Sequence, residues 1–138
     1  MSVILAFDFG ATRIGVAMAN NMLKISHPLM TVVGKNKYEK MDKIREIVQE
    51  WKPSLIIIGC PSIAVGNTQK ELLLTQINRF AGRLHYSFPE IAIALVNEDY
   101  TSAQGVDMLN EQNIRGIAQK DFLDQVAAVN ILNYFLEV

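Results

Sequence analysis

The stretch VILAFDFGATRIGVAMA, residues 3–19, holds two apolar runs that are separated by a short turn. The first run, Ser2–Phe9, is apolar at nearly every position before Asp8, which is typical of a central strand covered on both faces. Residues 10–12 indicate a tight turn. The second run, Ile14–Ala19, alternates apolar residues with a glycine and predicts a strand that pairs with the first as a hairpin.

The rest of the chain continues this pattern with alternating strand and helix signals. A third strand at Leu29–Val33 extends the hairpin to a three-stranded antiparallel meander. Further strands are predicted at Leu55–Ile58 and Ile91–Val96. The predicted helices lie at Met41–Trp51, Gln69–Leu84, Ser102–Gln112 and Asp121–Leu136. Loops are predicted at Ser62–Thr68 and Ile114–Gln119. The helix stripes assign Trp51 and Tyr134 to the core. A meander followed by βα units predicts an α/β fold with a mixed sheet and helices on its faces.

Composition limits the class of protein. A chain of 138 residues with 50% apolar and 20% charged residues predicts a single globular domain over residues 1–138. The chain has no apolar run of the roughly 18 residues that a membrane helix needs. It also lacks the basic segment ahead of an apolar one that marks a signal peptide, and its one cysteine cannot form a bridge within the chain. We therefore expect a cytoplasmic protein with no membrane contact. The net charge of −1 excludes binding of nucleic acid by bulk charge. Such binding would need a local patch or bound metal ions.

Three carboxylates are predicted to meet at the carboxyl end of the parallel strands, where α/β sheets place their ligands. Asp8 lies near the end of the first strand, Glu98 follows the last strand, and Asp124 lies near the start of the closing helix. Carboxylates brought together repel unless a cation compensates them. Hard oxygen ligands suit Mg²⁺ or Mn²⁺, which can align water with a phosphodiester. This is the chemistry of a metal-dependent nuclease.

The same residues have simpler interpretations. An aspartate at a strand end is commonly a turn residue, and Glu98 beside Asp99 would fit a polar loop. Asp121 would fit an ordinary N-cap, with Asp124 favoured by the helix dipole. Spacing alone leaves both interpretations open.

Four motifs resemble, in order and along nearly the whole chain, those of the YqgF family of Holliday-junction-resolvase-like proteins, also described as pre-16S rRNA nucleases. They are DFGATRIGVA at Asp8–Ala17, IIIGCPSIAVGNT at Ile56–Thr68, LVNEDYTSAQG at Leu95–Gly105 and KDFLDQVAAVNILNYFLE at Lys120–Glu137. The resemblance implies an RNase H-like fold with a five-stranded mixed sheet and helices on both faces. It also implies a cytoplasmic nuclease that acts on structured nucleic acid.

The resemblance assigns roles residue by residue. It implies that Asp8, Glu98 and Asp124 are catalytic and bind Mg²⁺ or Mn²⁺, with Asp121 as a further candidate ligand. It also implies substrate-binding roles for Arg13, Thr101, Ser102 and Lys120. Two departures stand out: the family's Asp-Glu-Arg is Asn97-Glu98-Asp99 here, and Val65 replaces an acidic residue. Asp99 would repel the phosphate that the arginine would grip.

Several functions remain open at this point. The resemblance implies processing of the 5′ end of pre-16S rRNA, or resolution of Holliday junctions by a homodimer, since symmetric cutting needs two active sites. A monomer fits the RNA substrate equally well. A third possibility is a catalytically impaired module that binds nucleic acid or protein. A nucleotide phosphotransferase of the actin type would need two such domains with a nucleotide between them, which 138 residues supply only if the chain dimerises.

Two basic stretches lie outside the predicted site. Lys35, Lys37, Lys40 and Lys43 surround Tyr38, and Arg79 and Arg83 precede His85. Both fit solvated helix faces, and both leave phosphate contact as an alternative.

Overall fold

Five strands form one mixed sheet in the order β3-β2-β1-β4-β5. The computed structural model describes residues 2–10, 12–22, 24–60, 68–97 and 116–137, with the backbone alone at 116–122 and 137. The strands are β1 (Val3–Phe9), β2 (Arg13–Asn20), β3 (Ile25–Val33), β4 (Leu55–Cys60) and β5 (Ala92–Asn97). β1, β2 and β3 pair antiparallel, and β4 and β5 run parallel to β1. The predicted meander with added parallel strands is confirmed.

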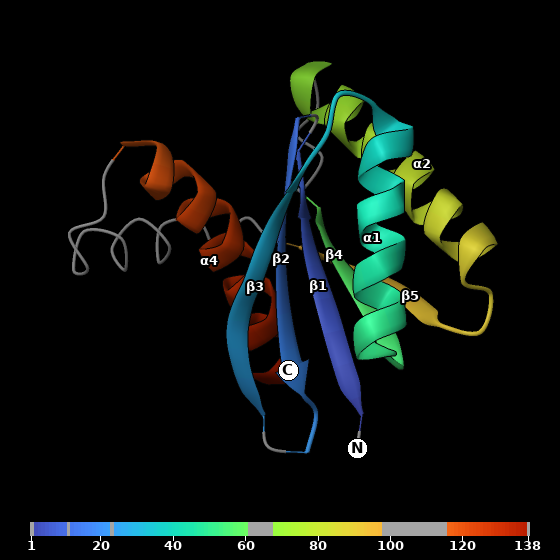
Figure 1. The fold of residues 1–138 in the computed structure, drawn as a ribbon, viewed down its shortest axis with the longest axis vertical. Helices are drawn as coiled ribbons and strands as arrows, with labels where there is room; N and C mark the ends of the chain where they lie inside the picture. The colour runs from blue at the N-terminus through green and yellow to red at the C-terminus, as the bar shows by residue number, and fades with distance from the viewer. Residues whose placement is uncertain (1, 11, 23, 61–67, 98–115, 138) are drawn as a thin grey trace.

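Helices cover both faces of the sheet. α1 (Lys37–Trp51) and α2 (Thr68–Ser87) lie on one side, and α4 (Gly116–Glu137) lies on the other (Figure 1). Side chains of β1 alternate between the two layers: Leu5 and Phe7 pack beneath α1 and α2, whereas Ile4 and Ala6 pack beneath α4. This alternation decides which layer each residue at the end of β1 faces.

The sequence accounts locally for α1. The Asn36 side chain accepts hydrogen bonds from the backbone N–H groups of Tyr38 and Glu39, so it caps the helix start. At the other end Lys52 adopts a left-handed conformation at φ 46°, and its N–H donates to the Val48 carbonyl. The predicted apolar stripe is confirmed, because its side chains at Met41, Ile44 and Val48 are buried, together with Ile47.

An aromatic cluster holds α2 against the end of β1. The Phe80 ring lies edge-on to Phe7, with centroids 5.7 Å apart, and 5.0 Å from the Phe9 ring. Phe80 and its neighbours on the helix stripe, Ile77 and Leu84, are fully buried. The end of β1 is therefore fixed by packing on the face opposite to α4.

Several boundaries differ from the sequence prediction. β3 begins at Ile25 and not at Leu29, because it pairs with β2 along the whole strand, and Pro28 is tolerated because β3 is an edge strand. α4 begins at Gly116, so the predicted loop over Ile114–Gln119 is wrong from Gly116 onward. The four residues after Gly116 are Ile, Ala, Gln and Lys, of which the last three favour helix.

The two aromatic residues assigned to the core differ in their burial. Tyr134 is 42% exposed, so its assignment to the core is wrong, whereas Trp51 packs at the margin of the core. The helix expected at Ser102–Gln112 lies outside the described residues. None of the helices that the structure describes is long and apolar enough to cross a membrane.

Candidate active site

Asp8 lies near the carboxyl end of β1, between two glycines. It pairs with Gly15 on β2 and with Gly59 on β4. Asp8 continues the alternation of Ile4 and Ala6, so its half-buried side chain faces the α4 layer. Because Gly15 and Gly59 have no side chains, no side chain flanks Asp8 on the two neighbouring strands.

Asp124 meets the sheet at that position. A β-carbon added to Gly15 would collide with the backbone carbonyl of Asp124. α4 therefore lies directly on the backbone of β2, an approach that only glycine permits. Since Gly15 is also the cross-strand partner of Asp8, the two aspartates lie on the same face, one residue position apart across the sheet. Residues that are 116 positions apart in sequence are brought together.

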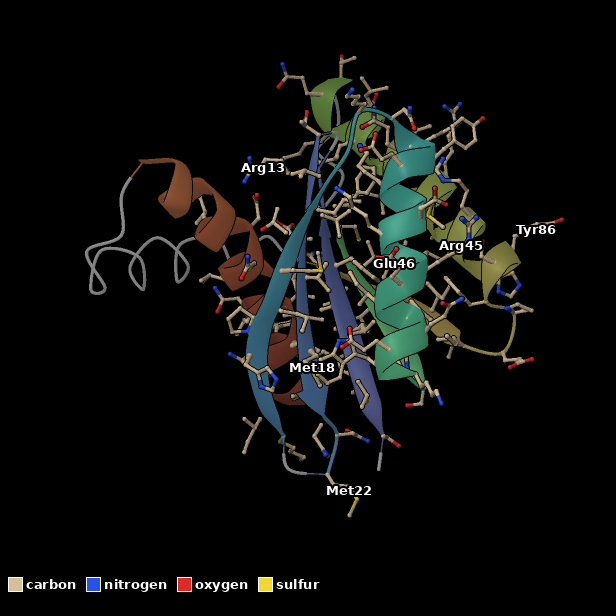
Figure 2. The ribbon with its side chains drawn as sticks, in the orientation of Figure 1. Arg13, Met18, Met22, Arg45, Glu46 and Tyr86 are labelled. Carbon is tan, nitrogen blue, oxygen red and sulfur yellow. The ribbon has the colours of Figure 1, made fainter. Side chains whose placement is uncertain are left out.

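Arg13 joins this cluster from the start of β2. Its Nε donates to the Oδ2 atom of Asp124 at 2.8 Å, and both side chains are about one quarter exposed, at 27% and 26%. Figure 2 shows Arg13 at the end of the sheet opposite to Met22, reaching toward the side of α4. A charge-assisted bond of this kind orients the carboxylate and balances its charge.

A second contact fixes the rotation of α4. The Gln125 amide donates to the Thr31 hydroxyl at 3.1 Å, which ties the helix to the edge strand β3. Thr31 pairs with Gly15, so Thr31, Gly15 and Asp8 form one row across three strands. Arg13 of β2 and Thr31 of β3 therefore both hold the helix close to the point where Asp124 meets β2.

The remaining predicted site residues are placed less completely. Lys120 and Asp121 lie in α4, where the backbone alone is described. Because α4 begins at Gly116, Asp121 is inside the helix, and its interpretation as an N-cap is wrong. Glu98, Thr101 and Ser102 lie outside the described residues, as do Asp99 and Val65, the two departures from the family pattern.

Register nevertheless relates the end of β5 to Asp8. Val96 pairs with Gly59, which in turn pairs with Asp8. Val96 also packs on the α4 side of the sheet. Val96, Gly59 and Asp8 therefore form one row across β5, β4 and β1.

The donor chemistry of this cluster suits a hard divalent cation. Asp8 and Asp124 present half-buried carboxylates on one face of the sheet, and carboxylate oxygens are the protein ligands that Mg²⁺ and Mn²⁺ prefer. Within the described part of the chain, no three His, Cys, Asp or Glu side chains gather as a metal site. The described residues thus supply two of the three predicted carboxylates.

Sequence reasoning did not identify the role of Gly15. The alternating pattern presents Gly15 only as one residue of a strand, yet Gly15 sets how closely α4 approaches β2. The available signal was a glycine inside a strand pattern, which indicates close approach of another backbone. Thr31 and Gln125 carried no comparable signal.

The sequence has close relatives. A relative from Nitrosospira multiformis, described as "Putative pre-16S rRNA nuclease", is 44% identical over 133 residues, covering 96% of this chain and 86% of the relative. A Neisseria gonorrhoeae protein with the same description is 42% identical, covering 96% of this chain and 86% of that protein.

Solved structures share the fold at low sequence identity. The fowlpox virus Holliday junction resolvase superposes with a TM-score of 0.59 at 15% identity, covering 98% of each chain. RuvC from T. thermophilus, in complex with a Holliday junction substrate, gives 0.56 at 13% identity, covering 95% of this chain and 92% of that one. The fold is therefore RNase H-like. Residues 2–138 match the family described as "RuvX: Holliday junction resolvase", and the chain belongs to this family, as its YqgF-like motifs predicted.

Proposed function

We propose that this protein is a metal-dependent endonuclease that processes the 5′ end of pre-16S rRNA. The observation that carries the proposal is the docking of α4 on Gly15, which sets Asp124 beside Asp8 on one face of the sheet. Two acidic residues at the carboxyl edge of a mixed sheet form the core of a site for phosphodiester hydrolysis. The chain acts as one nuclease domain in the cytoplasm.

The substrate class is supported by the relatives. Proteins that are 37–44% identical over nearly the whole chain are assigned as pre-16S rRNA nucleases. The alternative substrate is a four-way DNA junction, which the family description names. A junction resolvase needs two symmetric active sites, so a stable homodimer would favour the alternative and a monomer would favour RNA.

The carboxylates of Asp8, Asp124 and Glu98 would hold Mg²⁺ or Mn²⁺, with Asp121 as a further candidate. A divalent cation held there supplies positive charge to the scissile phosphate and lowers the pKa of water. This supply of charge matters because the chain itself has a net charge of −1.

The chain's own residues have distinct tasks in this proposal. Arg13 holds the Asp124 carboxylate in one orientation through the bond at 2.8 Å, and its guanidinium provides further donors for a phosphate oxygen. The Lys120 ammonium neutralises charge that develops on the phosphate. The hydroxyls of Thr101 and Ser102 donate to phosphate oxygens and position the strand.

A cleavage assay with three substrates tests the proposal. The substrates are an end-labelled rRNA precursor with a 5′ extension, an unstructured RNA of the same length, and a four-way DNA junction. Each is incubated with Mg²⁺, Mn²⁺ or EDTA. We expect site-specific cleavage of the precursor that requires metal and falls at least about 100-fold in Asp8→Asn. Cleavage of the junction alone would establish the alternative, and no cleavage by folded protein would favour a binding module.

A further inference from the structure

A groove runs between α1 and α2, on the face of the sheet opposite to the carboxylates. It consists of two adjoining cavities of about 520 Å³ and 560 Å³, which share Lys37, Tyr38, Met41, Arg79 and Arg83. Phe9, Ile14 and Phe80 line the first cavity beneath these polar side chains. We call this feature the α1–α2 groove. It joins the two basic stretches that are about 40 residues apart in the sequence.

The groove concentrates positive charge in a protein whose net charge is −1. Six of the 13 lysines and arginines line it: Lys35, Lys37, Lys40, Arg45, Arg79 and Arg83. Asp42 is the one acidic residue among the lining side chains, and it is already paired with Arg45 at 2.7 Å. The local potential is therefore positive, whatever the overall charge.

Exposed aromatic rings lie among these cations. Tyr38 is 71% exposed and Tyr86 is 88% exposed, and both line the groove. The Lys37 ammonium lies 5.3 Å from the centroid of the Tyr38 ring. Proteins that bind single-stranded nucleic acids combine exposed aromatic rings with a positively charged groove. The cations contact the phosphates, and the bases stack on the rings.

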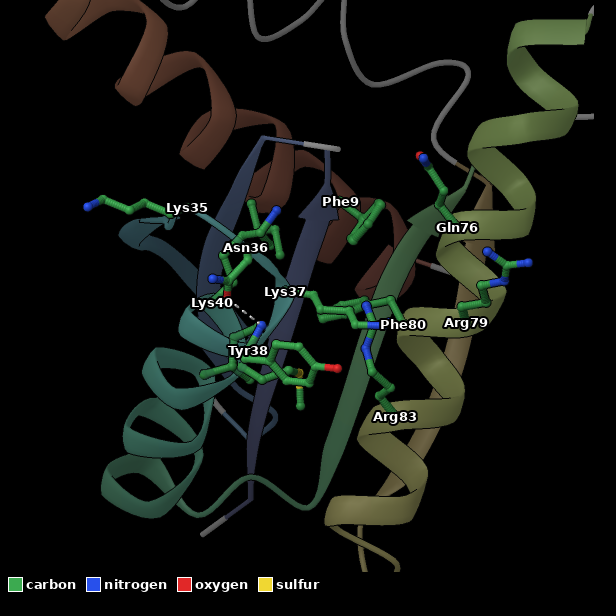
Figure 3. Close-up of a pocket in the computed structure, with 13 residues that line it drawn as sticks. Phe9, Lys35, Asn36, Lys37, Tyr38, Lys40, Gln76, Arg79, Phe80 and Arg83 are labelled. Carbon is green, nitrogen blue, oxygen red and sulfur yellow. Dashed lines mark hydrogen bonds between the residues drawn. The ribbon is translucent and has the colours of Figure 1, made fainter.

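Arg83 points into the groove with an unused donor. Its Nε atom is buried and has no hydrogen-bond partner among the described residues. Figure 3 shows Arg83 extending from α2 toward α1, while Tyr38 and Lys37 extend from α1 toward α2. A buried N–H without a partner is costly, and an anion in the groove would satisfy it.

We propose that the α1–α2 groove binds a single-stranded flank of the RNA that the enzyme cuts. The inference rests on the proposed function for the identity of that RNA, and on the groove itself for the mode of binding. Asp8 and Phe9 are consecutive residues of β1 that face opposite layers, with Asp8 toward α4 and Phe9 toward the groove. A strand that passes round this end of the sheet connects the groove to the carboxylates.

Binding is measured by fluorescence anisotropy in the Asp8→Asn background, so that cleavage neither interferes nor is required. The probe is a labelled 12-nucleotide single-stranded RNA, compared with an RNA hairpin without overhangs. The test variant is Lys37→Gln/Arg83→Gln. The control that removes the same charge is Lys24→Gln/Lys52→Gln, because Lys24 in the β2–β3 turn and Lys52 at the end of α1 are exposed lysines that do not line the groove. Circular dichroism confirms that each variant is folded.

We expect Lys37→Gln/Arg83→Gln to bind the single strand about tenfold more weakly. The slope of log affinity against log salt concentration should become shallower by about 1.4, since each lost phosphate contact removes about 0.7 from the slope. Tyr38→Leu should also weaken binding about tenfold, whereas Tyr38→Phe should retain it because phenylalanine still stacks. Lys24→Gln/Lys52→Gln should bind as the parent does.

Three outcomes would overturn the inference. The first is unchanged affinity in Lys37→Gln/Arg83→Gln, and the second is an equal loss in Lys24→Gln/Lys52→Gln, which would indicate bulk charge. The third is equal competition by a polyglutamate peptide of matched charge, which would indicate a site for acidic protein. Photocrosslinking of a 4-thiouridine strand provides an independent check, because crosslinks must fall on α1 and α2. Failure of the cleavage assay would leave these binding results intact, so the two proposals are tested separately.

Discussion

At the scale of single residues, the geometry of the candidate active site depends on a glycine, Gly15, which has no side chain. Gly15 allows α4 to rest on the backbone of β2 and so places Asp124 beside Asp8. Arg13 then holds the Asp124 carboxylate at 2.8 Å. Both contacts come from β2, the strand that pairs with the strand carrying Asp8. The hairpin thus supplies one acid directly and positions the other through packing.

Gly15→Ala should destabilise the protein by about 1–3 kcal/mol, the usual cost of overpacking a rigid site. The added methyl group would collide with a backbone carbonyl, which cannot rotate away as a flexible side chain can. Urea denaturation measures the loss. The matched control is Gly82→Ala in α2, where nothing lies within 4 Å of the added carbon.

Gly82→Ala should be neutral or stabilising by up to about 1 kcal/mol, because alanine favours helix over glycine. Equal stability of Gly15→Ala and wild type would show that α4 is not seated on Gly15 in solution.

At the scale of elements, the sequence predicted those whose signals are local. The strand at Val3–Phe9 and the stripe of α1 follow from apolar periodicity, and the structure confirms them. The start of α4 was not predicted, because Gly116 suggests a turn, although the alanine, glutamine and lysine at 118–120 favour helix. Of the site, the sequence placed Asp8 and Asp124 on one edge but missed Gly15, whose role exists only once α4 is docked.

Asn36→Ala should lower the free energy of unfolding by about 1 kcal/mol, because it removes the acceptor for two backbone N–H groups at the start of α1. Asn36→Ser should retain most of the stability, since serine also caps helices. Thermal unfolding of the two variants provides the measurement. If Asn36→Ala unfolds at the same temperature as the wild type, the cap contributes nothing to stability.

At the scale of the whole molecule, the sheet separates two chemistries. The α4 face carries Asp8 and Asp124, and the opposite face carries the six cations that line the α1–α2 groove. The two hydrophobic layers between them are built from fully buried aliphatic and aromatic side chains. The core stabilises the fold, and the proposed catalytic site lies at the end of the sheet.

Chelation with EDTA should abolish cleavage and leave the protein folded, because the core does not depend on a metal. Far-ultraviolet circular dichroism and a cooperative thermal transition report the fold, and product formation reports activity. Unfolding on chelation would instead indicate that the metal is structural.

The most direct test of the account is calorimetric titration of Mn²⁺ into four single variants and the wild type. Asp8→Asn, Glu98→Gln and Asp124→Asn each remove one proposed ligand, whereas Asp42→Asn removes an exposed carboxylate paired with Arg45. The account predicts tight binding in wild type and Asp42→Asn, and affinity at least about tenfold lower in each of the other three. Wild-type affinity in all three ligand variants would contradict a shared metal centre at the end of the sheet.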